Sequence, residues 1–215
     1  MQTPATAVLQ GRALACTRGE RTLFDGLDLD LQGGEALRIG GDNGAGKTSL
    51  LRILCGLSTP NAGTVSWGGV AIGTMREDFC RQLTYIGHLS GIKDDLSACE
   101  NLLLSLRLTG KTIERKAAYS ALAQMGLDEQ ADLPTRVLSQ GQKKRVALTR
   151  LLFSDPTPLW ILDEPFAALD QAAQQQLTAI MNRHLDDNGM LIYSTHQEIT
   201  LSAKNTITLM LREPC

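Results

Sequence analysis

The hydrophobic pattern at the start of the chain predicts strands. Residues 7–31 contain two β-favouring runs joined by a turn at residues 19–21, and the second run alternates leucine with aspartate. Such alternation is typical of a strand with one buried face. Residues 35–40 and 64–67 predict further strands, the latter in a hairpin that turns at residues 68 and 69. We therefore expect a subdomain rich in antiparallel β-structure.

Helical patterns become longer after about residue 88, and strands alternate with them. The strands that we expect lie at residues 83–86, 159–162, 190–194 and 207–211. The helices that we expect cover residues 47–56, 97–108, 113–125 and 139–154, a stretch after residue 170 and a short stretch after residue 196. Ser97 and Glu100 form a capping box at the start of the second of these helices. This alternation predicts an α/β fold. We expect one domain, residues 1–215, with a core of residues 1–87 and 155–215 and a helical part of residues 88–154.

The clearest chemical motif lies between the strand at residues 35–40 and the helix that follows. It fits the phosphate-binding pattern G-x-x-x-x-G-K-[ST] at every fixed position. Glycine lets the backbone direct its N–H groups at an anion, and the start of the helix adds a positive end. Lys47 supplies a cation and Thr48 a hydroxyl for Mg²⁺. The nucleotide-binding residues that we expect here are Gly41, Asp42, Asn43, Gly44, Ala45, Gly46, Lys47, Thr48 and Ser49.

Two adjacent carboxylates follow the apolar strand at residues 159–162. Asp163 and Glu164 thereby stand at the carboxyl end of a buried strand, where α/β sheets bind their ligands. Asp163 is suited to hold the Mg²⁺ of a bound nucleotide, and Glu164 to accept a proton from the water that attacks the γ-phosphate. The structural alternative is a strand-end turn with solvated acids.

Composition narrows the classes of function. The chain has 21 basic and 23 acidic residues, so it lacks the basic excess of many nucleic-acid-binding domains. Its five cysteines form no C-x-x-C pair, which argues against a zinc site, a redox dithiol or covalent haem attachment. The N-terminus lacks the pattern of a secretory signal, and no apolar run reaches about 18 residues. We therefore expect a cytosolic-side protein.

A further segment completes a familiar set of motifs. Leu138-Ser139-Gln140-Gly141-Gln142 precedes the acidic pair, and Ala168-Leu169-Asp170 and Ser194-Thr195-His196 follow it. In order and spacing, these segments and the phosphate loop resemble the ATP-binding subunits of ABC transporters over nearly the whole chain. The resemblance implies an ABC-type P-loop NTPase fold, with a mixed sheet core, an antiparallel β subdomain and a small helical signature subdomain.

The same resemblance implies an ATPase that uses ATP and Mg²⁺. Ser139, Gly141 and Gln142 would bind the nucleotide of a partner subunit, Asp170 would lie at the dimer interface, and His196 would contact the γ-phosphate. Thr48 and Asp163 would hold the metal, and Glu164 would act in catalysis with His196. Two copies of the chain would pack head to tail as a homodimer.

Two positions depart from the family pattern. Arg18 stands where an aromatic residue usually stacks on adenine, and its guanidinium either stacks on the base or is a solvated loop group. His88 stands where a glutamine usually faces the magnesium ion, eight residues before Leu96. We assign His88 to the catalytic site through its ring nitrogen, and the alternative is that it caps the strand ending at Ile86.

These departures, with Arg21-Thr22-Leu23-Phe24 and Trp160-Ile161-Leu162-Asp163-Glu164-Pro165-Phe166, most resemble the CcmA subfamily of cytochrome c biogenesis. One difference is Leu89-Ser90, where a Gln-Pro pair often follows the histidine. The resemblance implies a peripheral protein on the cytoplasmic face of the bacterial inner membrane. Its partners would be the membrane protein CcmB, with CcmC, CcmD and the haem chaperone CcmE in the wider complex. ATP hydrolysis would drive either haem export or release of the haem-loaded chaperone.

Two other functions use the same chemistry. One is the ATPase subunit of another small-substrate exporter. The other is a soluble ABC ATPase that acts on DNA or ribosomes, which is disfavoured because no heptad repeat or cysteine pair separates the phosphate loop from Ser139. A regulator that binds nucleotide without hydrolysis is disfavoured because Lys47, Asp163 and Glu164 are all present.

Overall fold

The computed structural model describes residues 8–88, 91–155 and 157–211. The predictions for residues 7, 89, 90, 156 and 215 lie outside the described residues. Contacts divide the chain into two compact units, and we describe each by itself. The first unit comprises Met1–Gly87, Pro156–Glu164 and Met181–Cys215, and the second comprises His88–Asp155 and Pro165–Ile180. The domain boundaries expected at residues 87 and 154 stay a prediction.

The first unit contains the antiparallel sheet that the alternating pattern predicts. Its strand order is β2-β1-β4-β5, with bounds β1 Val8–Arg18, β2 Arg21–Gln32, β4 Ala62–Trp67 and β5 Val70–Ala71. Leu29 and Leu31 of β2 are buried, while Asp28 and Asp30, which alternate with them, are exposed. The period of two therefore sets which face of this sheet meets the core.

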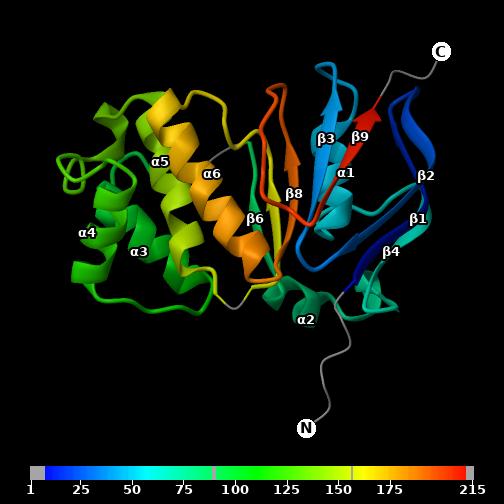
Figure 1. Cartoon of the computed structure of the whole chain (residues 1–215), viewed down its shortest axis with the longest axis horizontal. Helices are drawn as coiled ribbons and strands as arrows, with labels where there is room; N and C mark the ends of the chain where they lie inside the picture. Colours follow the sequence, from blue (N-terminus) through cyan, green and yellow to red (C-terminus); the bar gives the residue numbers. More distant parts are fainter. Residues whose placement is uncertain (1–7, 89–90, 156, 212–215) are drawn as a thin grey trace, which may run out of the picture. The chain divides into compact units, whose positions relative to one another are not determined.

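A second sheet of the first unit is parallel in all its described pairings. Its strand order is β6-β7-β8-β3-β9, and Figure 1 shows β3, β8 and β9 side by side. The bounds are β3 Glu35–Gly41, β6 Leu83–Ile86, β7 Leu159–Leu162, β8 Met190–Ser194 and β9 Asn205–Leu211. Because parallel strands end at the same edge, the loop after β3 and the acids after β7 come to one side of the sheet.

The helix α1, Lys47–Leu54, packs into the core of the first unit. Its residues Leu50, Leu51, Ile53 and Leu54 belong to one buried cluster with residues of both sheets. Leu57, the last residue of the predicted helical pattern, lies outside the helix and is half exposed. The short helix α2, Arg76–Arg81, is an element that we did not predict from the sequence.

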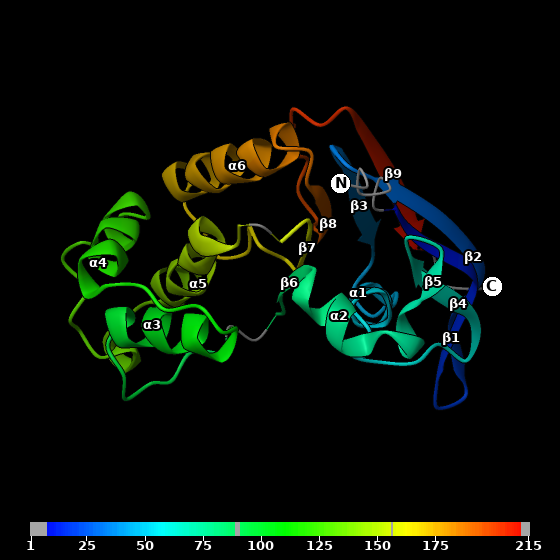
Figure 2. The same cartoon turned by 90° about the horizontal axis from the view of Figure 1, so that it is seen from below.

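The second unit is helical. Its helix α3, Ala98–Leu108, packs against α4, Arg115–Gln124, and α5, Gln140–Thr149, as Figure 2 shows. The predicted capping box is confirmed, since Ser97 accepts a hydrogen bond from the Glu100 amide and Glu100 accepts one from the Ser97 amide. Helix α6, Gln171–Asp186, runs from the second unit into the first.

One predicted helix is wrong. The chain after His196 forms no helix, and the described residues 197–204 have no regular secondary structure. Two amide groups in this segment bind groups outside it: Ser202 donates to the Asn182 side chain and Lys204 to the Gly34 carbonyl. β-Branched Ile199 and Thr200 also have low helix propensity. These two causes together account for the missing helix.

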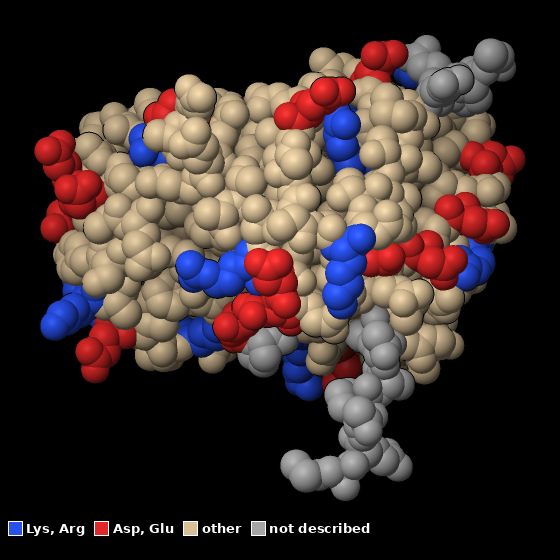
Figure 3. Space-filling view, viewed as in Figure 1, with Lys and Arg blue, Asp and Glu red and all other residues tan. Residues whose placement is uncertain are grey.

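The described cysteines, Cys16, Cys55, Cys80 and Cys99, are free, and all but Cys80 are buried. Burial raises the pKa of the Cys55 thiol to about 11. No described helix is long and apolar enough to cross a membrane. On the face drawn in Figure 3, basic and acidic side chains are interspersed, in keeping with a net charge of −2.

Asn101 holds the loop that precedes α3, and its replacement by alanine should destabilise the protein. Its side chain is buried, accepts a hydrogen bond from the Lys93 amide and donates to the carbonyls of Lys93, Leu96 and Ser97. Leaving such groups unpaired costs about 1–3 kcal/mol of unfolding free energy. Urea unfolding of Asn101→Ala measures this loss.

Asn182→Ala is the matched control, because its side chain accepts a single hydrogen bond in an exposed setting. We expect it to lose less than about 1 kcal/mol of unfolding free energy. Equal losses in the two variants would show that Asn101 does not organise the loop.

Candidate functional site

The loop after β3 has the backbone shape that a phosphate site needs. Gly41 has φ 133° and Gly46 has φ 100°, which are conformations that residues with a side chain rarely adopt. A methyl group on Gly41 would also lie 2.4 Å from the Leu211 carbonyl oxygen. The Ala45 amide donates to the Asp42 carbonyl within the loop. Glycine at these two positions is therefore required by the fold itself.

Helix α1 begins at this loop with no side-chain cap. Gly46 occupies the N-cap position and offers no side chain, and the first turn holds no acidic residue. The first amides of a helix carry a partial positive charge and need acceptors. An anion such as phosphate is a suitable acceptor at this end.

Lys47 is buried, and its ammonium group lies inside the loop. Nζ donates to the carbonyls of Gly41, at 2.7 Å, and Asp42, at 3.0 Å. It also lies 3.2 Å from Nε2 of His196. The cation is thus held at the loop before any ligand arrives.

His196 stands between this cation and Glu164. Its Nε2 atom lies 3.3 Å from Oε1 of Glu164. In the tautomer with its proton on Nδ1, Nε2 accepts from the Lys47 ammonium, which only donates, and it has no proton for Glu164. The Glu164 Oε1 atom is buried without a hydrogen-bond partner among the described residues.

The unpaired Oε1 atom of Glu164 determines what this side chain can bind. A carboxylate oxygen that is buried and unpaired has a strong demand for a donor, and a water molecule is such a donor. Glu164 is therefore suited to accept a proton from a bound water.

Thr48 and Asp163 form the oxygen pair that the sequence predicts for Mg²⁺. The Thr48 hydroxyl donates to Asp163 Oδ2 at 2.8 Å. Among the described residues, no group of three or more His, Cys, Asp or Glu side chains could hold a metal. Mg²⁺ prefers oxygen ligands and is often held by one or two protein groups with phosphate and water. The residues present fit that mode.

Tyr85 of β6 lies near this pair. Burial, with a smaller effect from the negative charge of Asp163, raises the pKa of Tyr85 to about 12. Its phenol therefore stays neutral at physiological pH.

Two residues near the site were missed by sequence reasoning. The Ser194 hydroxyl contacts both Asp163 and Glu164. A methyl group on Gly44 would lie 3.9 Å from Nη1 of Arg21, so that guanidinium is near the phosphate loop. A serine at the end of an apolar strand was the signal for Ser194, while Arg21 appeared only in the segment Arg21-Thr22-Leu23-Phe24, without a predicted role.

The signature residues belong to the second unit. Ser139 caps α5 in a reciprocal pair with Gln142, with hydrogen bonds of 3.2 and 2.8 Å. A methyl group on Gly141 would lie 2.5 Å from the Ala168 carbonyl oxygen, so only glycine fits there. Asp170 accepts from the Ala173 amide in the first turn of α6.

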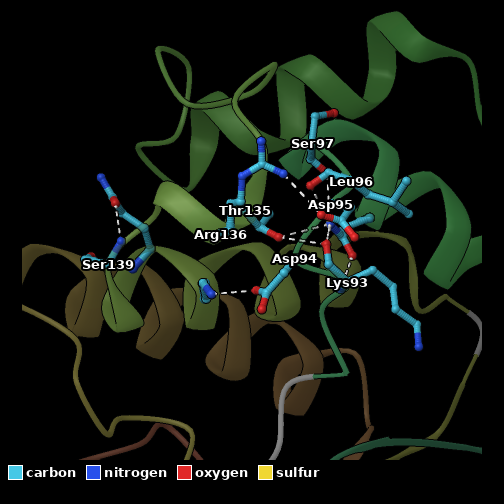
Figure 4. Close-up of polar contacts among 11 residues, drawn as sticks. Lys93, Asp94, Asp95, Leu96, Ser97, Thr135, Arg136 and Ser139 are labelled. Atoms are coloured by element: carbon cyan, nitrogen blue, oxygen red, sulfur yellow. Dashed lines mark hydrogen bonds and ion pairs between the residues drawn. The ribbon is translucent and has the colours of Figure 1, made fainter.

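The loop before α3 is tied to the segment that carries the signature, as Figure 4 shows. Lys143 of α5 lies 2.6 Å from Asp94, and Arg136 lies 3.1 Å from Asp95. The Thr135 hydroxyl donates to the Lys93 carbonyl. Ion pairs at the surface contribute little to the free energy of unfolding. The hydrogen bonds of the buried residues Thr135 and Asn101 therefore do most to hold this loop in place.

The two positions that depart from the family pattern are both exposed. Arg18 is the last residue of β1, opposite Arg21 across the hairpin turn. His88 follows β6 and is exposed at the start of the second unit. Their roles in nucleotide or metal binding stay predictions.

Comparison with known proteins gives concordant similarities. Residues 24–167 match the family model described as "ABC transporter". The chain is 49% identical over 204 residues to the "Cytochrome c biogenesis ATP-binding export protein CcmA" of Nitrosomonas europaea, covering 95% of each chain. It is 48% identical to the protein of the same name from Dechloromonas aromatica, covering 95% of this chain and all of that one.

Solved structures share the fold. An ABC transporter ATP-binding protein from Pyrococcus furiosus superposes with a TM-score of 0.79 at 21% identity, over 95% of this chain and 97% of that one. An ATP-binding cassette solved as a dimer in a post-hydrolysis state with ADP and phosphate gives a TM-score of 0.77 at 23% identity, over 88% of each chain. At these identities the likeness concerns the fold alone.

Proposed function

The chain belongs to the ABC transporter family, in its CcmA group, and from that premise we propose that it powers a membrane complex of c-type cytochrome biogenesis. It is an ABC-type ATPase, which converts ATP and water to ADP and phosphate. The observation that carries the proposal is the convergence of Lys47, His196 and Glu164 through contacts of 3.2 and 3.3 Å.

The phosphate loop binds the nucleotide in this proposal. The glycine-rich backbone and the uncapped start of α1 bind the phosphates, with Lys47 as the cation of the loop. His196 contacts the γ-phosphate. The residues of this binding group are Gly41, Asp42, Asn43, Gly44, Ala45, Gly46, Lys47, Thr48 and Ser49.

Glu164 is the proposed general base. Its unpaired Oε1 accepts a proton from the water that attacks the γ-phosphate. Thr48 and Asp163 would hold Mg²⁺, which supplies neutralising charge for the phosphates when bound. His88 is proposed as an accessory group near the attacking water, and Arg18 as a stacking surface for adenine.

A second copy of the chain completes each site in this proposal. Ser139, Gly141 and Gln142 contact the γ-phosphate bound to the partner subunit, and Asp170 lies at the interface. The helix that starts at Ser139 directs its positive end at that phosphate. The protein would therefore work as a homodimer.

The proposed setting is the cytoplasmic face of the bacterial inner membrane, where the chain would be peripheral. CcmB is the proposed membrane-spanning partner, with CcmC, CcmD and CcmE in the wider complex. ATP hydrolysis would serve haem export or the release of a haem-loaded chaperone. The name of the relatives, an ATP-binding export protein of cytochrome c biogenesis, supports this setting.

A complementation experiment tests the function. A bacterium that lacks its own CcmA relative should recover haem-bound c-type cytochromes when this chain is expressed, and should not recover them with Glu164→Gln. Glu35→Gln is the control, because the Glu35 side chain accepts a hydrogen bond from the nearby Gln32 amide, in an exposed part of the first unit. Failure of the wild-type chain at normal expression would contradict the proposal.

Extraction from native membranes distinguishes the alternatives. The chain should co-purify in detergent with a multi-spanning protein of the cytochrome system. A different multi-spanning partner would indicate another exporter. Recovery without any membrane protein would favour a soluble ATPase.

A further inference from the structure

Ser194 is a fully buried polar residue at the end of an apolar strand. It closes β8, whose other residues, 190–193, are apolar or aromatic and buried. β8 lies between β7 and β3, so Ser194 ends a strand that has a neighbour on each side. A hydroxyl in such a place must be hydrogen-bonded or it destabilises the fold.

The Ser194 hydroxyl both donates and accepts a hydrogen bond, and its partners are the two neighbouring acids. Oγ donates to Oδ1 of Asp163 at 2.7 Å. The same atom accepts from the Glu164 amide at 2.8 Å. One oxygen therefore joins the side chain of the first acid to the backbone of the second.

The bond to Glu164 acts on a strained backbone. Glu164 has φ 46°, in the left-handed region that residues other than glycine seldom occupy. Such a conformation persists only where its surroundings hold it. The Ser194 hydroxyl is one of the groups that hold it. The direction of the Glu164 side chain depends on this backbone, and so does the 3.3 Å approach of Oε1 to His196.

The bond to Asp163 acts on a carboxylate that has a partner on each oxygen. Ser194 binds Oδ1 and Thr48 binds Oδ2. A carboxylate held at Oδ1 presents Oδ2 in a fixed direction, toward Thr48. Ser194 thus also orients the oxygen pair that suits Mg²⁺.

We propose that Ser194 is a positioning residue for hydrolysis, whose hydroxyl fixes the Glu164 backbone and the Asp163 carboxylate together. This inference rests on the proposed ATPase function. The hydroxyl contacts neither the phosphate loop nor the Lys47 ammonium among its described hydrogen bonds. Its removal should therefore affect turnover more than nucleotide binding.

Ser194→Ala tests the inference directly. We expect kcat to fall about 10- to 100-fold, since a small misplacement of a catalytic group has effects of this size, while KM for ATP stays within about threefold. Ser194→Thr keeps the hydroxyl and should restore most of kcat. Ser154→Ala is the control, because it removes a buried hydroxyl that donates to the Leu151 carbonyl in the second unit. Its kcat should stay at the wild-type value.

Hydrogen exchange gives a readout that does not depend on activity. In the nucleotide-free protein, the Glu164 amide should exchange at least about tenfold faster in Ser194→Ala than in the wild type or Ser154→Ala. If Ser194→Ala does not fold, the same measurement is made on Ser194→Cys, whose side chain has the same shape but forms a weaker hydrogen bond.

The outcomes separate this inference from the proposed function. Wild-type kcat and wild-type exchange at Glu164 in the folded Ser194→Ala variant would overturn the role of Ser194 and leave the ATPase intact. A higher KM for ATP without a change in kcat would also overturn it. Absence of ATP hydrolysis by the wild type would overturn the function, while the exchange rates would still decide whether Ser194 holds Glu164.

Discussion

Lys47→Ala should lose ATP hydrolysis, with a decrease of at least about 100-fold in kcat/KM. The ammonium group lies inside the phosphate loop, bound to the Gly41 and Asp42 carbonyls and near His196. A hydrogen bond to a charged group contributes about 1.5–3 kcal/mol, which corresponds to about 10- to 150-fold weaker nucleotide binding. Steady-state ATP hydrolysis and equilibrium binding of a fluorescent ATP analogue measure the two effects.

Lys204→Ala is the matched control for this variant. Its ammonium group also donates to a backbone carbonyl, that of Gly33, and to the Asn188 side chain in the first unit. We expect it to bind and hydrolyse ATP as the wild type does. Hydrolysis at the wild-type rate by Lys47→Ala would remove the loop from the mechanism.

Glu164→Gln should keep ATP binding and hydrolyse ATP about 100- to 10,000-fold more slowly. The amide has the size of the carboxylate, so the left-handed backbone and the bond from the Glu164 amide to Ser194 should survive. It cannot take a proton from water. Neither atom of the amide is a base at physiological pH, so neither can replace the unpaired Oε1.

Single-turnover hydrolysis and size-exclusion chromatography with ATP measure this result. Slow turnover with intact binding should accumulate an ATP-loaded dimer. Glu35→Gln, which changes an acid outside the site, should hydrolyse ATP normally and show no such accumulation. Unimpaired hydrolysis by Glu164→Gln without a dimer would exclude Glu164 as the base.

Most elements were predictable because each depends on residues close together in the chain. The leucine and aspartate alternation in β2 and the Ser97 capping box are local signals, and both are confirmed. The phosphate loop is similarly local, because its glycines and Lys47 act through their own backbone. A motif identified Gly141 in the sequence. The reason why this position needs glycine is the close approach of the Ala168 carbonyl, which belongs to a distant segment of the chain.

The helix predicted after His196 shows where local signals fail. Asn182 and Gly34 bind amides that a helix would need. The position of Arg21 near the loop depends likewise on how the first hairpin meets α1. Neither contact is encoded in a spacing that can be read along the chain.

By itself, the sequence determined the fold class, the phosphate loop and the residues that bear the reactive groups. Residue types at short spacings specify these features, since they define local backbone shape and chemical capacity. Only the tertiary structure decided how those groups are paired. His196 Nε2 lies between Lys47 Nζ and Glu164 Oε1, which has no hydrogen-bond partner among the described residues, and Ser194 joins the two acids. These pairings depend on three strands that meet at one sheet edge, and hydrogen bonds of fixed direction form only after that edge is assembled.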